Sequence, residues 1–228
     1  MSQLIMGRSS VAPFIEIVSQ YQHDTDRTET ALQKINSGPN GKLLLNEIKS
    51  LSKNGRMVSI HVSEGFQDRA FPILTESQIK RFGIASAHST ESNLKAEEIS
   101  RKRGFMQKGE GVSSIIDYDP SLYVDITPGG RHEMTVDEDR AFIALAHELV
   151  HAYRNMNGTH LNTSPNPDNE IAREELRVIG TGEFKDARIS ENRIRADHGL
   201  PLRTRHKAEL SSDIQREIEN MLEQSPRR

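Results

Sequence analysis

Cysteine and tryptophan are both absent from the 228 residues, and aromatic side chains make up only 5% of the chain. The absence of cysteine excludes disulfide bridges, iron–sulfur clusters, thiolate zinc sites and cysteine nucleophiles. Any metal ion must therefore be held by His, Asp or Glu, so the nine histidines become the first candidate ligands.

Long apolar runs and a strong net charge are also missing. The most apolar run, residues 141–146, is far shorter than the roughly 20 residues of a membrane-spanning helix, and the N-terminus lacks the apolar centre of a secretory signal peptide. The formal charge of −3, from 30 basic and 33 acidic residues, indicates neither a nucleic-acid nor a membrane partner. A hydrophobic content of 34% and a mean hydropathy of −0.65 predict one modest core.

The pattern along the chain predicts an α+β protein. Residues 1–23 show no clear period and are expected to form a flexible leader, and residues 24–228 to form a single domain. A long helix is expected between a cap at Thr135 and a stop at Asn157 and Gly158. The other predicted helices are 24–36, 42–53, 76–81, 94–102, 170–179, 190–198 and 210–222, and the predicted strands are 57–62, 70–74, 112–117 and 122–126.

His147 and His151 lie four residues apart within the long helix, and Glu148 follows the first of them. Residues at that spacing share one helical face, so both imidazoles can bind the same metal ion. The pattern H-E-x-x-H is typical of zinc peptidases, in which the glutamate takes up and returns the proton of the attacking water. The apolar neighbours of the motif disfavour the ordinary alternative, a surface helix with two unrelated histidines, because buried His and Glu need partners.

Such a zinc site needs a third protein ligand and an open fourth position. Gly158 and His160 lie at the wrong offsets for the three-histidine pattern H-E-x-x-H-x-x-G-x-x-H. The next helix offers the carboxylates Glu170, Glu174 and Glu175. Successive helical side chains point about 100° apart, so the last two cannot both face the metal, and periodicity alone does not choose. The ordinary alternative for either is a solvated carboxylate or an ion pair with a nearby arginine.

HELVHA at residues 147–152, followed by EELRVIG at 174–180, resembles the clostridial neurotoxin light chains, which have H-E-L-I-H-A and then E-E-L-R-x-x-G. The first glutamate of the pair binds zinc in that family. The resemblance therefore implies that Glu174 is the third ligand and that Glu175 orients a ligand.

The neurotoxin light chains also use an Arg-x-x-Tyr pair to stabilise the developing oxyanion. Arg195 and His198 have the same spacing, with His in place of Tyr, and would share a face of a short helix. The structural alternatives are an ion pair for Arg195 and a helix-end cap for His198.

A longer match resembles the NleD family of zinc endopeptidase effectors, which bacteria deliver by type III secretion. It rests on KGEG, AHELVHA, EELR and IRADHGLPLR at residues 108–111, 146–152, 174–177 and 194–203. The resemblance implies a gluzincin-like, Zn²⁺-dependent metalloprotease domain with a small sheet packed on the H-E-x-x-H helix. It also implies a virulence role in the host cytoplasm and cleavage of host MAP kinases of the JNK and p38 type in the activation loop. The leader would suit a type III secretion signal, and a secretion chaperone is a further candidate partner.

Two other function classes stay open. One is a zinc-stabilised effector that has lost catalysis and acts by binding a host protein, which the intact Glu148 disfavours. The other is metal-dependent hydrolysis of a non-peptide amide. The strands at 112–117 and 122–126 are expected to hold a peptide substrate as an added strand at a sheet edge. The remaining histidines show no ligand spacing and are interpreted as ordinary: His23, His61, His88, His132, His160 and His206.

Overall fold

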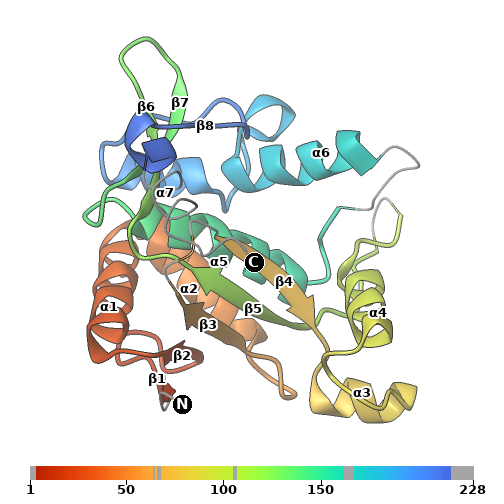
Figure 1. Ribbon diagram of the computed structural model, residues 1–228. Helices are drawn as coiled ribbons and strands as arrows, with labels where there is room; N and C mark the ends of the chain where they lie inside the picture. Colours follow the sequence, from red (N-terminus) through yellow and green to blue (C-terminus); the bar gives the residue numbers. More distant parts are fainter. Residues whose placement is uncertain (1–3, 64, 66–67, 105–106, 162–166, 217–228) are drawn as a thin grey trace, which may run out of the picture.

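A five-stranded mixed sheet forms the centre of the protein in a computed structural model (Figure 1), with the strand order β1-β2-β3-β5-β4. β2 (Ile15–Ser19), β3 (Val58–Val62) and β5 (Ser113–Tyr118) are parallel. β1 (Ile5–Arg8) and β4 (Arg69–Ile73) run antiparallel at the two edges. The structure describes residues 4–63, 65, 68–104, 107–161 and 167–216, without the side chains of 167–172.

Helices α1 (Gln22–Ser37), α2 (Pro39–Leu51) and α5 (Phe142–Met156) pack on one face of this sheet. The α+β class, with the sheet packed on the H-E-x-x-H helix α5, is therefore confirmed. The other helices are α3 (Glu76–Phe82), α4 (Thr90–Ser100), α6 (Pro167–Ile179) and α7 (Glu191–Asp197). None of the helices in the described ranges is both long and apolar enough to cross a bilayer.

The core forms where the apolar face of the sheet packs against the apolar faces of the helices. Alternate residues of the strands, such as Ile15 and Ile60, point to the helical side and are fully buried. On the helices, residues three to four apart do the same, among them Ile48 of α2 and Leu145 and Leu149 of α5. Packing against both α2 and the sheet sets the rotation of α5, and with it the direction of its polar face.

β1 and β2 lie within the residues 1–23 that were expected to form a flexible leader. β2 pairs with β3, placing Ile15 opposite Val58 and Ile17 opposite Ile60, and both isoleucines are buried. The structure differs from the expectation because a five-residue strand is too short to show a clear period. Its stability comes from neighbouring strands rather than from its own sequence.

The expected helix cap at Thr135 is wrong. Thr135 belongs to β7 (His132–Val136), which forms an antiparallel hairpin with β6 (Leu122–Ile126). Asp137 instead caps the turn before α5, since its carboxylate accepts the Arg140 amide at 2.9 Å and its carbonyl accepts the Ala141 amide at 2.8 Å. Hairpin pairing thus outweighs the capping preference of threonine.

Of the two strands expected to lie at a substrate-binding sheet edge, β6 is an edge strand and β5 is not. β5 is interior, between β3 and β4, and β6 belongs to a separate three-stranded sheet with β7 and β8 (Glu209–Leu210). Two edge strands therefore contact α5: β4 of the five-stranded sheet and β6 of the three-stranded sheet. Of the helix expected at 210–222, residues 212–216 are helical, and 217–222 lie outside the described residues.

Candidate metal centre

α5 carries both histidines of the H-E-x-x-H motif on its polar side. The apolar side of the helix is held in the core, so His147 and His151 point in one direction. Their ring centroids are 4.9 Å apart, and each residue is 8% exposed. The spacing expected from the sequence therefore brings two imidazoles within reach of one ion.

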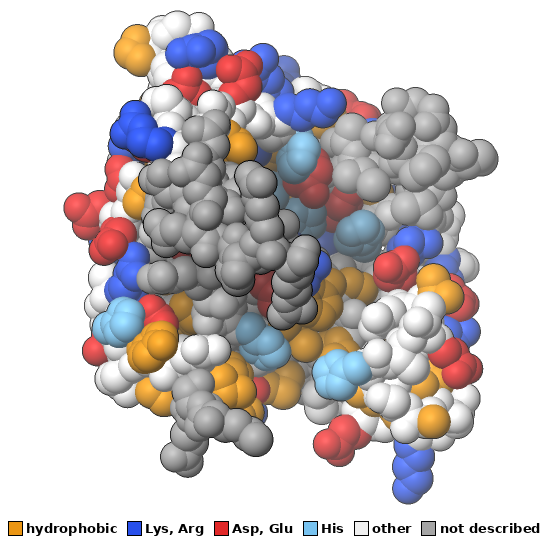
Figure 2. All heavy atoms as spheres, in the orientation of Figure 1, with side chains coloured by type: hydrophobic (Ala, Val, Ile, Leu, Met, Phe, Trp, Pro, Cys, Tyr) orange, Lys and Arg blue, Asp and Glu red, His pale blue; other side chains and the backbone are white. Residues whose placement is uncertain are grey.

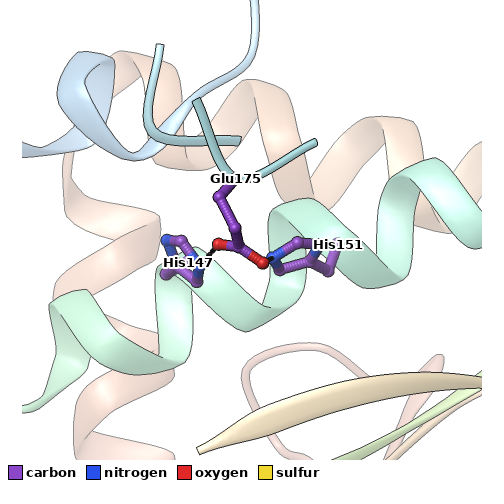
Figure 3. Close-up of side chains that lie close together, drawn as sticks. All are labelled: His147, His151 and Glu175. Carbon is purple, nitrogen blue, oxygen red and sulfur yellow. Dashed lines mark hydrogen bonds and ion pairs between the residues drawn. The ribbon is translucent and has the colours of Figure 1, made fainter. Parts of the chain in front are cut away.

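The carboxylate of Glu175, from α6, lies between the two rings (Figure 3). Its Oε2 is 3.2 Å from Nε2 of His147, and its Oε1 is 3.3 Å from Nε2 of His151. Donor atoms about 2.0–2.1 Å from a tetrahedral zinc ion lie about 3.3 Å from one another. The spacing and the His-His-Glu donor set thus fit a zinc ion.

The electrostatics of this position favour positive charge. Burial opposes protonation of His147, but its hydrogen bonds to Glu175 and Glu191 outweigh burial and raise the pKa of His147 to about 10. Burial likewise opposes ionisation of Glu175, but His151 and His147 hold the pKa of that carboxyl far below its usual range. Carboxylates surround the imidazoles, so a cation between them is electrostatically stabilised.

Glu174 takes a different position from the one expected. Its carboxylate forms a bidentate ion pair with Arg154, with Nε–Oε1 and Nη2–Oε2 distances of 2.5 and 2.7 Å. It also accepts the amide of Leu161 at 3.0 Å. Burial opposes ionisation, but Arg154 lowers the pKa of Glu174 to about 2. The two glutamates have therefore exchanged places relative to the expectation: Glu175 faces both rings, and Glu174 lies behind them.

Glu174 also approaches His151 and His160 from behind the site. Its Oε1 lies 4.0 Å from Nδ1 of His151 and 3.9 Å from Nε2 of His160. These three residues have donor atoms close enough to hold an ion. However, both oxygens of Glu174 already accept hydrogen bonds from Arg154, whose positive charge balances that of the carboxylate. Glu174 is therefore a poorer metal ligand than Glu175.

Glu191 fixes the other side of His147. It stands in the first turn of α7, which Ser190 caps, and its Oε2 is 2.8 Å from Nδ1 of His147. Arg195 and Arg203 bind the same carboxylate, at 2.6 and 3.2 Å. A carboxylate on Nδ1 leaves Nε2 free for a metal and sets the plane of the ring.

Glu148 lies beside the rings in a small cavity of about 120 Å³, which Asp68 and His206 also line. Burial raises the pKa of Glu148, and the two histidines and the backbone amide of Ala70 act against that rise. Burial also raises the pKa of Asp68. Figure 2 shows histidine and acidic side chains gathered in a hollow at the upper right of the face it presents.

Arg195 and His198 do not form the pair expected from their spacing. Arg195 is fully buried and donates to Glu191, the hydroxyl of Tyr123 and the carbonyl oxygens of Val124 and Pro201. It lines the small cavity, but these partners use its guanidinium. The ring of His198 packs edge-on against Phe142 at 4.7 Å and is not among the residues lining the cavity.

Sequence reasoning missed Glu191, Asp68 and His206. None has a spacing relation to the H-E-x-x-H motif, and each comes from a different part of the chain. The Ser190 cap predicted a helix start, but a glutamate in a first helical turn is too common to indicate a site.

Three of the solved structures that this chain resembles are botulinum neurotoxin light chains. For the serotype HA light chain the TM-score is 0.39 and the identity 15%, covering 64% of this chain and 37% of that one. For the Clostridium botulinum serotype F light chain the TM-score is 0.36 and the identity 18%, covering 58% of this chain and 35% of that one. For the type G light chain the TM-score is 0.39 and the identity 12%, covering 91% of this chain and 69% of that one. The chain thus spans little more than a third of the serotype HA and F light chains.

No curated protein matches this sequence. The family model Peptidase_M91, described as effector protein, matches residues 15–206, a range that contains α5, α6 and α7. The match extends over most of the chain and includes every residue described above around the candidate metal centre. This protein therefore belongs to the M91 peptidase family of effector proteins.

Proposed function

We propose that the protein is a zinc-dependent endopeptidase in which His147, His151 and Glu175 bind the metal. The observation that carries this proposal is the convergence of two imidazoles and one carboxylate at ligand–ligand spacing, with Glu148 beside them. Membership of a peptidase family supports the same reaction class. We assign Glu175 rather than the expected Glu174 as the third ligand, because Arg154 pairs with both oxygens of Glu174.

A bound zinc ion would supply a Lewis acid for the scissile carbonyl and make a coordinated water easier to deprotonate. Glu148 accepts a proton from the attacking water and later returns it to the leaving amine. Its burial raises the pKa, which suits a group that must hold a proton between these two steps. Glu191 keeps the plane of the His147 ring fixed throughout.

We further propose that the protein acts inside a host cell, after type III secretion, on MAP kinases of the JNK and p38 type. Support for the substrate comes from the NleD-like motifs, above all IRADHGLPLR at 194–203, and from membership of an effector family. Residues 1–23 would contain the type III secretion signal, and a secretion chaperone would bind this segment before export.

Purified protein incubated with JNK or p38 tests the reaction and the substrate together. We expect the kinases to be cut within the activation loop by the wild type, and not by Glu148→Gln or after treatment with a chelator. If the wild type binds zinc but leaves these kinases and a panel of unfolded proteins intact, the peptidase proposal fails. The remaining choice would then be an effector that acts by binding.

The choice between the two glutamates has its own test. We expect Glu175→Ala to lose stoichiometric zinc, and Glu174→Ala to retain it while becoming less stable. Zinc content after dialysis, measured beside the melting temperature, separates these outcomes. The reverse pattern would restore Glu174 as the ligand.

A further inference from the structure

His206 lies outside every motif and yet reaches the metal centre. Its Nδ1 is 3.1 Å from Oε2 of Glu175, the oxygen that also faces His147. The side chain is 47% exposed and lines the small cavity with Glu148. The imidazole thus contacts the carboxylate at Nδ1 while about half of the side chain remains exposed.

The backbone that carries His206 is fixed to the core of the site. Asn192 of α7 donates to the carbonyl of Arg203 at 2.8 Å and accepts its amide at 2.7 Å. The Arg203 guanidinium binds Glu191 at 3.2 Å and also the carbonyl oxygens of Arg205 and His206. The location of His206 therefore depends on a buried network rather than on a chance contact of a surface side chain.

The geometry argues against His206 as a fourth ligand. Among the described residues, two groups have donor atoms that all lie within 4.8 Å of one another, His147–His151–Glu175 and His151–His160–Glu174, and neither contains His206. His206 instead contacts Oε2 of Glu175, the oxygen that also faces His147. The carboxylate of Glu175 can rotate about χ2 and χ3 of its side chain. A hydrogen bond from His206 restricts this rotation.

We propose that His206 is a positioning residue of the metal centre: it donates from Nδ1 to Oε2 of Glu175 and holds that carboxylate toward the two imidazoles. This inference rests on the proposed assignment of Glu175 as a zinc ligand. Loss of an outer partner of a metal ligand commonly weakens metal binding by about 10–100-fold. Metal affinity, rather than substrate binding, should therefore carry the effect.

The experiment compares His206→Ala with His206→Asn, because the Asn amide nitrogen can occupy the place of Nδ1. His88→Ala serves as a control, since it removes an exposed imidazole from the turn before α4, and His88 does not line the cavity that contains Glu148. Zinc dissociation constants come from competition with a chelating dye, and the Co²⁺-loaded proteins give visible absorption spectra of the site. KM and kcat are measured at saturating zinc.

We expect His206→Ala to bind zinc about 10–100-fold more weakly and to change the Co²⁺ spectrum. His206→Asn should lie within a few-fold of the wild type, and His88→Ala should equal it. Unchanged zinc affinity and spectrum in His206→Ala, with a raised KM, would show a substrate contact and overturn the proposal. A wild type that binds zinc but cleaves nothing would overturn the peptidase alone, because the difference in zinc affinity between wild type and His206→Ala still tests the role of His206.

Discussion

The ion pair between Arg154 and Glu174 is expected to stabilise the metal-free protein rather than to serve the reaction. Both side chains are at most 5% exposed, and two charge-assisted hydrogen bonds join them. We predict that Glu174→Gln, in the presence of a chelator, loses about 3 kcal/mol of unfolding free energy. The substitution keeps the shape of the side chain and leaves the guanidinium of Arg154 buried without its counter-charge.

Two independent arguments give this magnitude. Removing one partner of a buried ion pair typically costs about 3–5 kcal/mol. The fall in the pKa of Glu174 from the ordinary value of 4.5 to about 2 corresponds to roughly 3 kcal/mol. Because the pKa is lower in the folded protein, the stabilisation is complete above about pH 4.5 and is lost as the pH falls toward about 2.

Urea unfolding of wild type, Arg154→Met, Glu174→Gln and the double variant measures the interaction directly. The double-mutant cycle should give a coupling of about 2–4 kcal/mol near neutral pH and much less near pH 2.5. A coupling below about 0.5 kcal/mol would refute the argument, as would a Glu174→Gln variant that keeps full stability and loses zinc.

Three further predictions concern other parts of the structure. Glu191→Gln should weaken zinc binding by about 10–100-fold in a dye-competition assay, because the amide orients the facing imidazole less firmly; equal affinity would count against this role. Gly158→Ala should cost at least about 1–2 kcal/mol in urea unfolding, since φ is +64° and a Cβ would lie 2.3 Å from the carbonyl oxygen of Gly109. Gly182→Ala, with φ of +58° but open space around the Cβ, is its control and should lose less. Burial lowers the pKa of His132, so the folded protein should lose stability as the pH falls below 6.5, and His132→Phe should lose less between about pH 7.5 and about pH 5.5.

Much of the site could be predicted from local spacing. Two histidines four residues apart must share a face of any helix, so His147 and His151 meet whatever the rest of the fold does. The absence of cysteine left only His and carboxylates as ligands. The helices also follow from apolar periods long enough to read, such as the one predicted at 42–53 and found at Pro39–Leu51.

The choice between Glu174 and Glu175 depended on tertiary structure. Adjacent helical residues point about 100° apart, so a small rotation of α6 decides which of them meets α5. Arg154 sets that rotation by pairing with Glu174 from α5 itself. No period within α6 contains this information, because the deciding partner lies on another helix.

The outer contacts of the metal centre depended on tertiary structure to an even greater degree. Glu191 and His206 come from segments that reach the site only after α7 packs on α5 and the chain returns past it. β1 and β2 likewise depend on strand pairing, since a strand of four or five residues is not stable by itself. The amino-acid sequence thus determined the candidate metal-binding helix through spacing along one element, whereas the third candidate ligand, Glu175, and its supports were decided by contacts between elements distant in the chain.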